Sequence, residues 1–318
     1  MNLLIPSAWR SAPVIVTMTL GLALIVVWIV WENFAPYPMV PGYLFKNKVS
    51  NLADILVSNS QRVSILTLFI TALAGANFYS LLNFWPLECQ TFYGPDPHAI
   101  ARTVVAFGYA VALGVIIVDY CLSLFRGMNR ELLLISSVFM TAGIGAMAAV
   151  NDSNPSLGIG MSFLGGFGVG GIIVPAAVIL TIVSPDEVIA TITAITLSVR
   201  LIGGSIGYAI YFNVFENKLT AVFPTIVGTA VIKAGLPITE LVPFLTALSV
   251  KNTTAIGEMS GITPAILEAA EAAVNVAYAE AFKQIYLVSI AFGGAAILAS
   301  LFLGDIRKYM VDRVAVQI

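Results

Sequence analysis

Long apolar runs with almost no charges dominate this chain of 318 residues. A hydrocarbon layer about 30 Å thick needs about 20 apolar residues of α-helix to cross it. Because backbone groups find no water in hydrocarbon, such runs must be helices, and they lack the alternation of a membrane β-barrel. We therefore predict an all-α, polytopic membrane protein with seven transmembrane helices, at Ala12–Trp31, Val63–Trp85, Val104–Phe125, Leu132–Val150, Ser156–Val183, Val188–Phe215 and Ile285–Leu303.

The composition excludes several classes of protein. Charged residues make up 10% of the chain, whereas soluble domains carry about 25%, and the net charge is −2. There is one histidine, His98, only two cysteines, and no GxxxxGK[ST], HExxH or paired CxxC motif. We therefore expect no enzymatic activity, no cofactor, no metal site and no nucleic-acid partner, and we expect the lipid bilayer to be the surrounding solvent.

Lysine and arginine near span ends predict the orientation, because they remain on the cytoplasmic side. With seven spans, three basic groups fall on one side of the membrane: Lys46, Lys48 and Arg62; Arg126 and Arg130; and Arg307, Lys308 and Arg313. The expected organisation is a first span at 1–33, a cytoplasmic connection at 34–62, a six-helix unit at 63–303 and a cytoplasmic tail at 304–318. A long extracellular helical loop is expected at 216–284.

That outer loop contains two expected helices and one modification motif. The segments Thr239–Val250 and Thr263–Phe282 are typical of helices, the second with Pro264 in its first turn. Asn252 begins an N-x-T glycosylation motif, for which an unmodified polar loop is the alternative.

Arg200 lies near the middle of its predicted span, 13 residues after Glu187, or about 20 Å along a helix. A lone arginine there costs about 2.5–3.5 kcal/mol, so it needs a carboxylate, carbonyl oxygens or water. Spacings of three and four place it in a stripe that either lines a substrate or proton cavity or packs against a neighbouring helix. The stripe consists of Thr193, Thr196, Arg200, Gly203, Gly207 and Tyr211.

The second span carries a similar stripe of Asn77, Ser80, Phe84 and Glu88, with Pro86 expected to break the helix before Glu88. An amide, a hydroxyl and an aromatic ring on one face suit an amphiphilic organic ligand, and ordinary interhelical hydrogen bonding is the alternative. We predict substrate contacts at Asn77, Ser80, Phe84, Arg200 and Tyr211.

Two carboxyl groups are candidates for proton coupling, Glu88 and Asp119. Asp119 shares a helix face with Gly108, Ala112 and Val115, which predicts that it points into a close helix contact. Alternatively, it reaches the cytoplasmic headgroups near Arg126.

Glycines are concentrated in the fifth span, where Gly166-x-x-x-Gly170 permits close approach of another helix. We expect the same packing role for Gly203 and Gly207. Such a helix could also bend during transport, whereas tight packing alone is the simpler interpretation.

Four stretches together resemble the major facilitator superfamily, and most closely its fungal trichothecene efflux pump family, among the fourteen-span drug:proton antiporters. The most specific stretch contains R-x-x-G-G-S-I-G, which begins at Arg200. The stretches are ALAGANFYSLLNFWPLECQTFYG (Ala72–Gly94), MTAGIGAMAAVN (Met140–Asn151), FLGGFGVGGIIVPAAV (Phe163–Val178) and SPDEVIATITAITLSVRLIGGSIGYAIYFNVF (Ser184–Phe215).

The resemblance implies the second linker span followed by the carboxy-terminal six-helix half, with Val63–Val150 and Ser156–Leu303 as its inverted three-helix repeats. A connection with Arg126, Gly127 and Arg130 is similar to a degraded basic loop motif that lacks its acidic residue.

The resemblance further implies proton-driven efflux of small organic toxins by alternating access. The expected partners are a small amphiphilic organic substrate, protons and a missing amino-terminal half. The expected location is the plasma membrane, with the vacuolar membrane as the alternative.

Two other interpretations remain open at this stage. Seven spans with an outer amino terminus also describe a seven-helix receptor, although Cys89 is the only cysteine in the outer connections and the last span contains no lysine. The chain could also be an inactive, truncated gene product.

Overall fold

Helices make up all the regular structure in the part of the chain that the computed structural model describes, residues 12–34, 59–94, 96–185, 188–249, 259 and 262–310. The prediction of an all-α fold is therefore confirmed. The α-helices are α1 (Ala12–Phe34), α4 (Asn59–Phe92), α5 (Pro97–Leu124), α6 (Asn129–Ala146), α7 (Pro155–Ile173), α8 (Pro175–Val183), α9 (Ile189–Lys233), α10 (Leu241–Ser249) and α12 (Pro264–Leu301). Short 3₁₀ turns are η2 (Met147–Ala149), η4 (Ile238–Glu240) and η5 (Arg307–Tyr309).

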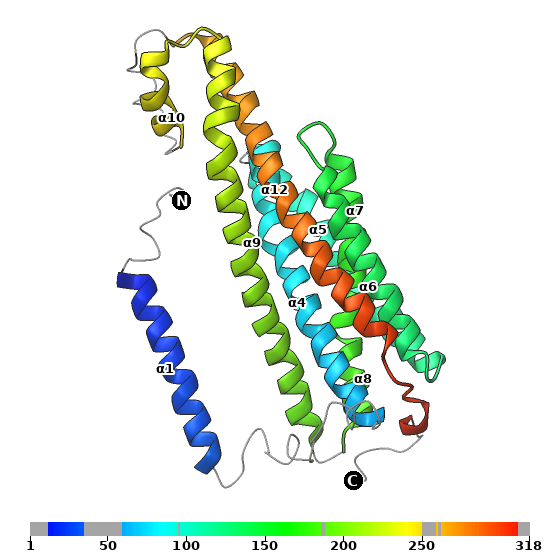
Figure 1. The fold of residues 1–318 in the computed structure, drawn as a ribbon. Coiled ribbons are helices and arrows are strands. Elements are labelled where there is room, and N and C mark those ends of the chain that lie inside the picture. Colours follow the sequence, from blue (N-terminus) through cyan, green and yellow to red (C-terminus); the bar gives the residue numbers. More distant parts are fainter. Residues whose placement is uncertain are drawn as a thin grey trace.

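Six helical segments in these ranges are long and apolar enough to cross a membrane. They are Gln61–Phe92, Pro97–Leu124, Asn129–Ala149, Pro155–Val183, Ile189–Lys233 and Pro264–Leu301. The expected first span coincides with α1, which is drawn apart from the bundle in Figure 1 and is not among the six. Six membrane-competent helices are thus found in the described part of the chain, while the total of seven spans and the division of the chain into units stay predictions.

Helix α4 lies at the centre of the bundle and packs against α9 and α12. Helix α7 packs between α5 and α6, and its glycines determine how close those helices come. A methyl group at Gly170 would overlap the carbonyl oxygen of Val111 in α5, and one at Gly168 would overlap the backbone of Met140 in α6. Lipid tails provide no hydrophobic force between helices, so this close approach contributes to association through van der Waals contact.

Proline residues mark two different outcomes along the bundle. Pro175 begins α8 directly after the end of α7 at Ile173. Pro86, in contrast, lies inside α4, which continues to Phe92, so the predicted break before Glu88 was wrong. Proline removes one backbone hydrogen bond, and burial of the apolar side chains of Phe84, Trp85 and Cys89 around it offsets that loss.

The helices α9 and α12 are much longer than a membrane requires, at 45 and 38 residues, or about 68 and 57 Å. Figure 1 shows both extending beyond the other helices at one end, near α10. Each helix continues without a break past the predicted span ends at Phe215 and Ile285, and those span ends stay predictions. The expected helices at Thr239–Val250 and Thr263–Phe282 correspond to α10 and to the first half of α12.

A buried apolar seam explains why the two extensions stay helical. Leu219, Phe223 and Val227 of α9 are buried, as are Ala273 and Ala277 of α12. The small side chains of the two alanines let α12 lie close to α9. The two extensions belong to the same hydrophobic core as the rest of the bundle. Asn252, the predicted glycosylation site, lies outside the described residues.

We predict that Gly170→Ala destabilises the bundle by about 1–3 kcal/mol, because its new methyl group meets backbone that can move only with its helix. The matched control is Gly160→Ala on the same helix, where a methyl group meets nothing within 4 Å. Alanine favours helix over glycine, so the control should unfold at the same or a higher temperature. Thermal unfolding of both purified variants in detergent would reveal equal midpoints if this packing were unimportant.

Candidate functional site

The polar stripe of α4 faces the interior of the bundle. Asn77 and Ser80 are completely buried, Glu88 is 1% exposed and Phe84 is 2% exposed. The spacing therefore placed all four residues on one face, and that face packs against α9 and α12.

Asn77 and Tyr211 form the first polar contact of this face. The Tyr211 hydroxyl donates a hydrogen bond to Asn77 Oδ1 over 3.1 Å, which joins α4 to α9. The amide Nδ2 of Asn77 is buried and has no hydrogen-bond partner among the described residues. The hydroxyl of Ser80 donates to the backbone oxygen of Asn77 over 2.7 Å. The structure thus brings three of the five predicted substrate-contact residues together, with one buried donor unused.

Aromatic rings surround Phe84 above this contact. The centroid of the Phe84 ring lies 5.7 Å from the ring centroid of Tyr208, 6.5 Å from the ring centroid of Tyr211 and 6.1 Å from the ring centroid of Phe215. Tyr208 is 37% exposed, so the buried cluster reaches the surface of the bundle through its ring. The arrangement offers an aromatic surface next to amide and hydroxyl groups.

Glu88 makes the second polar contact, with a residue that the sequence interpretation missed. The hydroxyl of Tyr286 on α12 donates to Glu88 Oε2 over 2.5 Å, and Tyr286 is completely buried. Its spacing offered a signal, because Phe282, Tyr286, Ser289 and Gly293 follow one another at steps of four, three and four residues.

Arg200 lies deep in the bundle beside Gly75 of α4, where a methyl group would come within 3.1 Å of Arg200 Cγ. Gly75 is 13 residues from both Arg62 and Glu88, or about 20 Å along the helix in each direction. The side chain is half-buried, and no residue in the described ranges forms a hydrogen bond or ion pair with its guanidinium. The structure therefore does not pair Arg200 with Asp119, with Glu88 or with a neighbouring carbonyl.

The rest of the Arg200 stripe packs against α4. Methyl groups at Gly203 and Gly207 would overlap Ala72 and Ala76, respectively. Thr196 is buried, and its hydroxyl donates to the carbonyl of Ile192 over 2.7 Å. Around the glycines, the geometry matches the packing interpretation of the stripe.

Asp119 is half-buried on α5, and its buried Oδ1 atom has no hydrogen-bond partner in the described part of the chain. Its predicted companions Gly108 and Ala112 are exposed, and nothing lies within 4 Å of a methyl group at Gly108. The predicted close contact on that face was wrong, because α5 packs through a different face that carries Gly114 and Val118.

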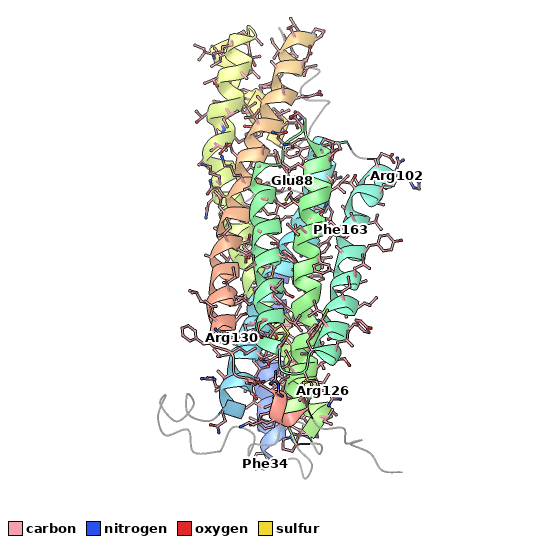
Figure 2. The ribbon with its side chains drawn as sticks, turned by 90° about the vertical axis from the view of Figure 1, so that its right-hand side faces the viewer. Phe34, Glu88, Arg102, Arg126, Arg130 and Phe163 are labelled. Atoms are coloured by element: carbon pink, nitrogen blue, oxygen red, sulfur yellow. The ribbon has the colours of Figure 1, made fainter. Side chains whose placement is uncertain are left out.

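The turn between α5 and α6 contacts the segment after α12. Figure 2 shows Arg126 and Arg130 at the end of the bundle opposite Glu88 and Arg102. Gly127 has a positive φ of 91°, which glycine adopts readily, and the Asp305 carboxylate approaches within 2.9 Å of where its methyl group would be. Arg307 Nε donates to the Arg126 carbonyl over 3.2 Å. An acidic group is therefore close to this loop, although it comes from the tail.

The comparisons with known proteins agree with one another. The family model described as fungal trichothecene efflux pump matches residues 5–318. The chain is 25% identical over 317 residues to the trichothecene efflux pump TRI12 of Fusarium sporotrichioides, covering 98% of this chain and 50% of that protein. It is also 25% identical over 306 residues to the MFS-type transporter prx5 of Penicillium rubens, covering 94% and 53%, respectively. The chain thus spans about half the length of these relatives.

We predict that Tyr211→Phe lowers the free energy of unfolding by about 1–2 kcal/mol, because Asn77 Oδ1 loses its partner while remaining buried. The control is Tyr208→Phe, which removes a hydroxyl group from an exposed ring that forms no hydrogen bond in the described structure. Chemical unfolding of the two variants in detergent tests this, and equal losses would mean that the hydrogen bond adds nothing.

Proposed function

Because the chain belongs to the fungal trichothecene efflux pump family, we propose that it provides one six-helix unit of a membrane transporter that exports small organic toxins by alternating access. The observation that carries this proposal is the family match over residues 5–318 in a chain with six membrane-competent helices. The relatives are named as efflux pumps and MFS-type transporters, which supports a transport function over a seven-helix receptor or an enzyme.

A second six-helix unit is part of the proposal. The chain covers 50% of the Fusarium pump, and transporters of this type hold substrate between two halves. The half-buried guanidinium of Arg200 supports this arrangement, because a charge at that depth is costly without a partner. A carboxylate or polar group from the second unit, or from the substrate, would supply the partner.

We assign substrate contact to the region around Asn77, Ser80, Phe84 and Tyr211, with Arg200 below it. The exposed Tyr208 ring, which packs on Phe84, offers a route by which these buried groups reach a ligand. The aromatic and amide groups suit a neutral, amphiphilic organic molecule, and the name of the Fusarium relative suggests trichothecenes as the first class to test.

The proposed energy source is a proton gradient, with Glu88 and Asp119 as the carboxyl groups that could couple it to transport. Both lie within spans, where ionisable side chains are rare and costly. The proposed location is the plasma membrane, with the vacuolar membrane as the alternative.

We expect lipid vesicles that contain this chain and the amino-terminal half of the Fusarium pump to accumulate a labelled trichothecene when their lumen is acidic. A protonophore should abolish the uptake, and either half alone should match empty vesicles. Co-purification shows that the halves assemble, and the intact Fusarium pump is the positive control. Equal transport by this chain alone would refute the need for a second unit, and an assembled pair without transport would refute the efflux function.

In the same vesicles, Arg200→Ala should reduce the transport rate by about 10- to 100-fold, because the proposed partner on the second unit or the substrate would lose a hydrogen bond to a charged group, worth about 1.5–3 kcal/mol. Arg102→Ala is the matched control, because Arg102 lies at the outer end of α5 and bonds only to its own helix, at His98. If both variants transport at the parental rate, Arg200 has no role in the cycle.

A further inference from the structure

Glu88 and Tyr286 form an enclosed acidic pair between α4 and α12. Glu88 is 1% exposed, Tyr286 is completely buried, and the Tyr286 hydroxyl donates to Glu88 Oε2 over 2.5 Å. No lysine, arginine or histidine in the described ranges forms an ion pair with Glu88. Tyr286 is thus the only side chain there that offers this carboxyl group a hydrogen bond.

Aromatic rings from three helices enclose the pair. Phe84 and Phe92 lie one turn before and one turn after Glu88 on α4, and Phe282 lies one turn before Tyr286 on α12. The ring centroid of Phe282 is 6.1 Å from that of Phe92 and 4.9 Å from that of Phe215 on α9. The rings keep bulk water away from the pair in this conformation, so exchange with water requires them to move.

The other ionisable groups at this end lie on all the elements packed around the pair. They are Cys89 and Tyr93 on α4, Asp96, His98 and Arg102 at the start of α5, Asp152 before α7, Glu216 and Lys218 on α9, and Tyr278, Glu280 and Lys283 on α12. None of these groups forms a hydrogen bond or ion pair with Glu88.

Tyr93 connects this region to the surface. It is half-buried, and its hydroxyl donates to the Asn151 carbonyl in the connection before α7 over 3.1 Å. Figure 2 shows Glu88 at the end of the bundle opposite Arg126 and Arg130, which the charge rule places in the cytoplasm. Water that enters beside Tyr93 would therefore come from the outer side.

We propose that Glu88 and Tyr286 form a proton-binding site that exchanges protons with the outer solution and regulates the contact between α4 and α12. In the step, the carboxylate oxygen accepts a proton from hydronium, one O–H bond forms, and water leaves. The hydrogen bond from Tyr286 to a carboxylate is charge-assisted and about twice as strong as one to a neutral carboxyl group. Protonation therefore weakens the link between the two helices. Its use in transport rests on the proposed function, whereas proton binding itself does not.

Infrared difference spectroscopy of the chain in lipid nanodiscs tests proton binding without any transport. We expect acidification to produce a carbonyl band of a protonated carboxyl group that is missing in Glu88→Gln and shifted in Tyr286→Phe. The control is Glu280→Gln, on the exposed ion pair with Lys283, which should leave the band unchanged. A band that is the same in all three variants and the parent would overturn the proposal.

The native thiol of Cys89 reports on the helix contact. Cys89 is buried next to Glu88, and Cys121→Ala leaves it as the single cysteine. At one pH on the alkaline side of the infrared transition, where the parent carries an ionised Glu88, we expect a thiol reagent to label Cys89 severalfold faster in Glu88→Gln, which mimics the neutral acid, and in Tyr286→Phe than in the parent or in Glu280→Gln. Equal rates in all four chains would overturn the regulation of the helix contact. Circular dichroism confirms that each variant is folded, and Tyr286→Phe serves if Glu88→Gln does not fold.

If the infrared band and the Cys89 labelling behave as expected but the two-half vesicles do not transport, the proposed efflux function is refuted and the proton site is supported. Loss of both signals, with efflux intact, would refute the proton site alone.

Discussion

Direct contact between helix backbones is the interaction on which this bundle depends. In a bilayer, lipid tails surround each helix with material as apolar as its own side chains, so association must come from close packing and polar contacts. The glycines of α7 serve two neighbours at once, with Gly170 against α5 and Gly168 against α6. Gly203 and Gly207 do the same for α9 against α4. These contacts leave almost no space for a larger side chain, which fixes the register of the helices.

Polar contacts add to this packing, and α4 makes two of them. It bonds to α9 through Asn77 and Tyr211 and to α12 through Glu88 and Tyr286. In a low-dielectric interior, an unpaired buried group is costly, so each contact specifies one relative position of two helices. Within the described residues, the buried Nδ2 of Asn77 and the half-buried guanidinium of Arg200 have no hydrogen-bond partner, and both lie toward the middle of the span.

The sequence pattern predicted the helices well where apolar runs had clear ends. It predicted them less well where packing against other helices determined the helix end or the buried face. The stripe from Asn77 to Glu88 was correctly placed on one face, because helical spacing alone determines that. The lengths of α9 and α12 were not predictable from hydropathy, since both helices continue beyond the predicted span ends through buried side chains such as Phe223 and Ala277. The face of α5 was misassigned, because both of its faces carry small residues and only the neighbour α7 selects Gly114 over Gly108.

The hydrogen-bond partners of buried polar groups also could not be predicted from the local sequence around each group. Tyr286 is more than 190 residues from Glu88, and nothing in either local sequence specifies that they meet. The position of Arg200 in its span was predictable from spacing, whereas its lack of a partner in the described chain required the structure.

The unbroken length of α9 and α12 has a mechanical consequence. Each helix extends well beyond the other helices at the end near α10, and a buried seam joins the two extensions. Two helices joined in this way would move together as one stiff unit, turning about the close contact between α9 and α4. A small tilt of α9 against α4 at Gly203 and Gly207 would therefore displace the far ends of both helices, near α10, by a larger distance. A change in helix packing within the spans would thus alter the shape of the extended end.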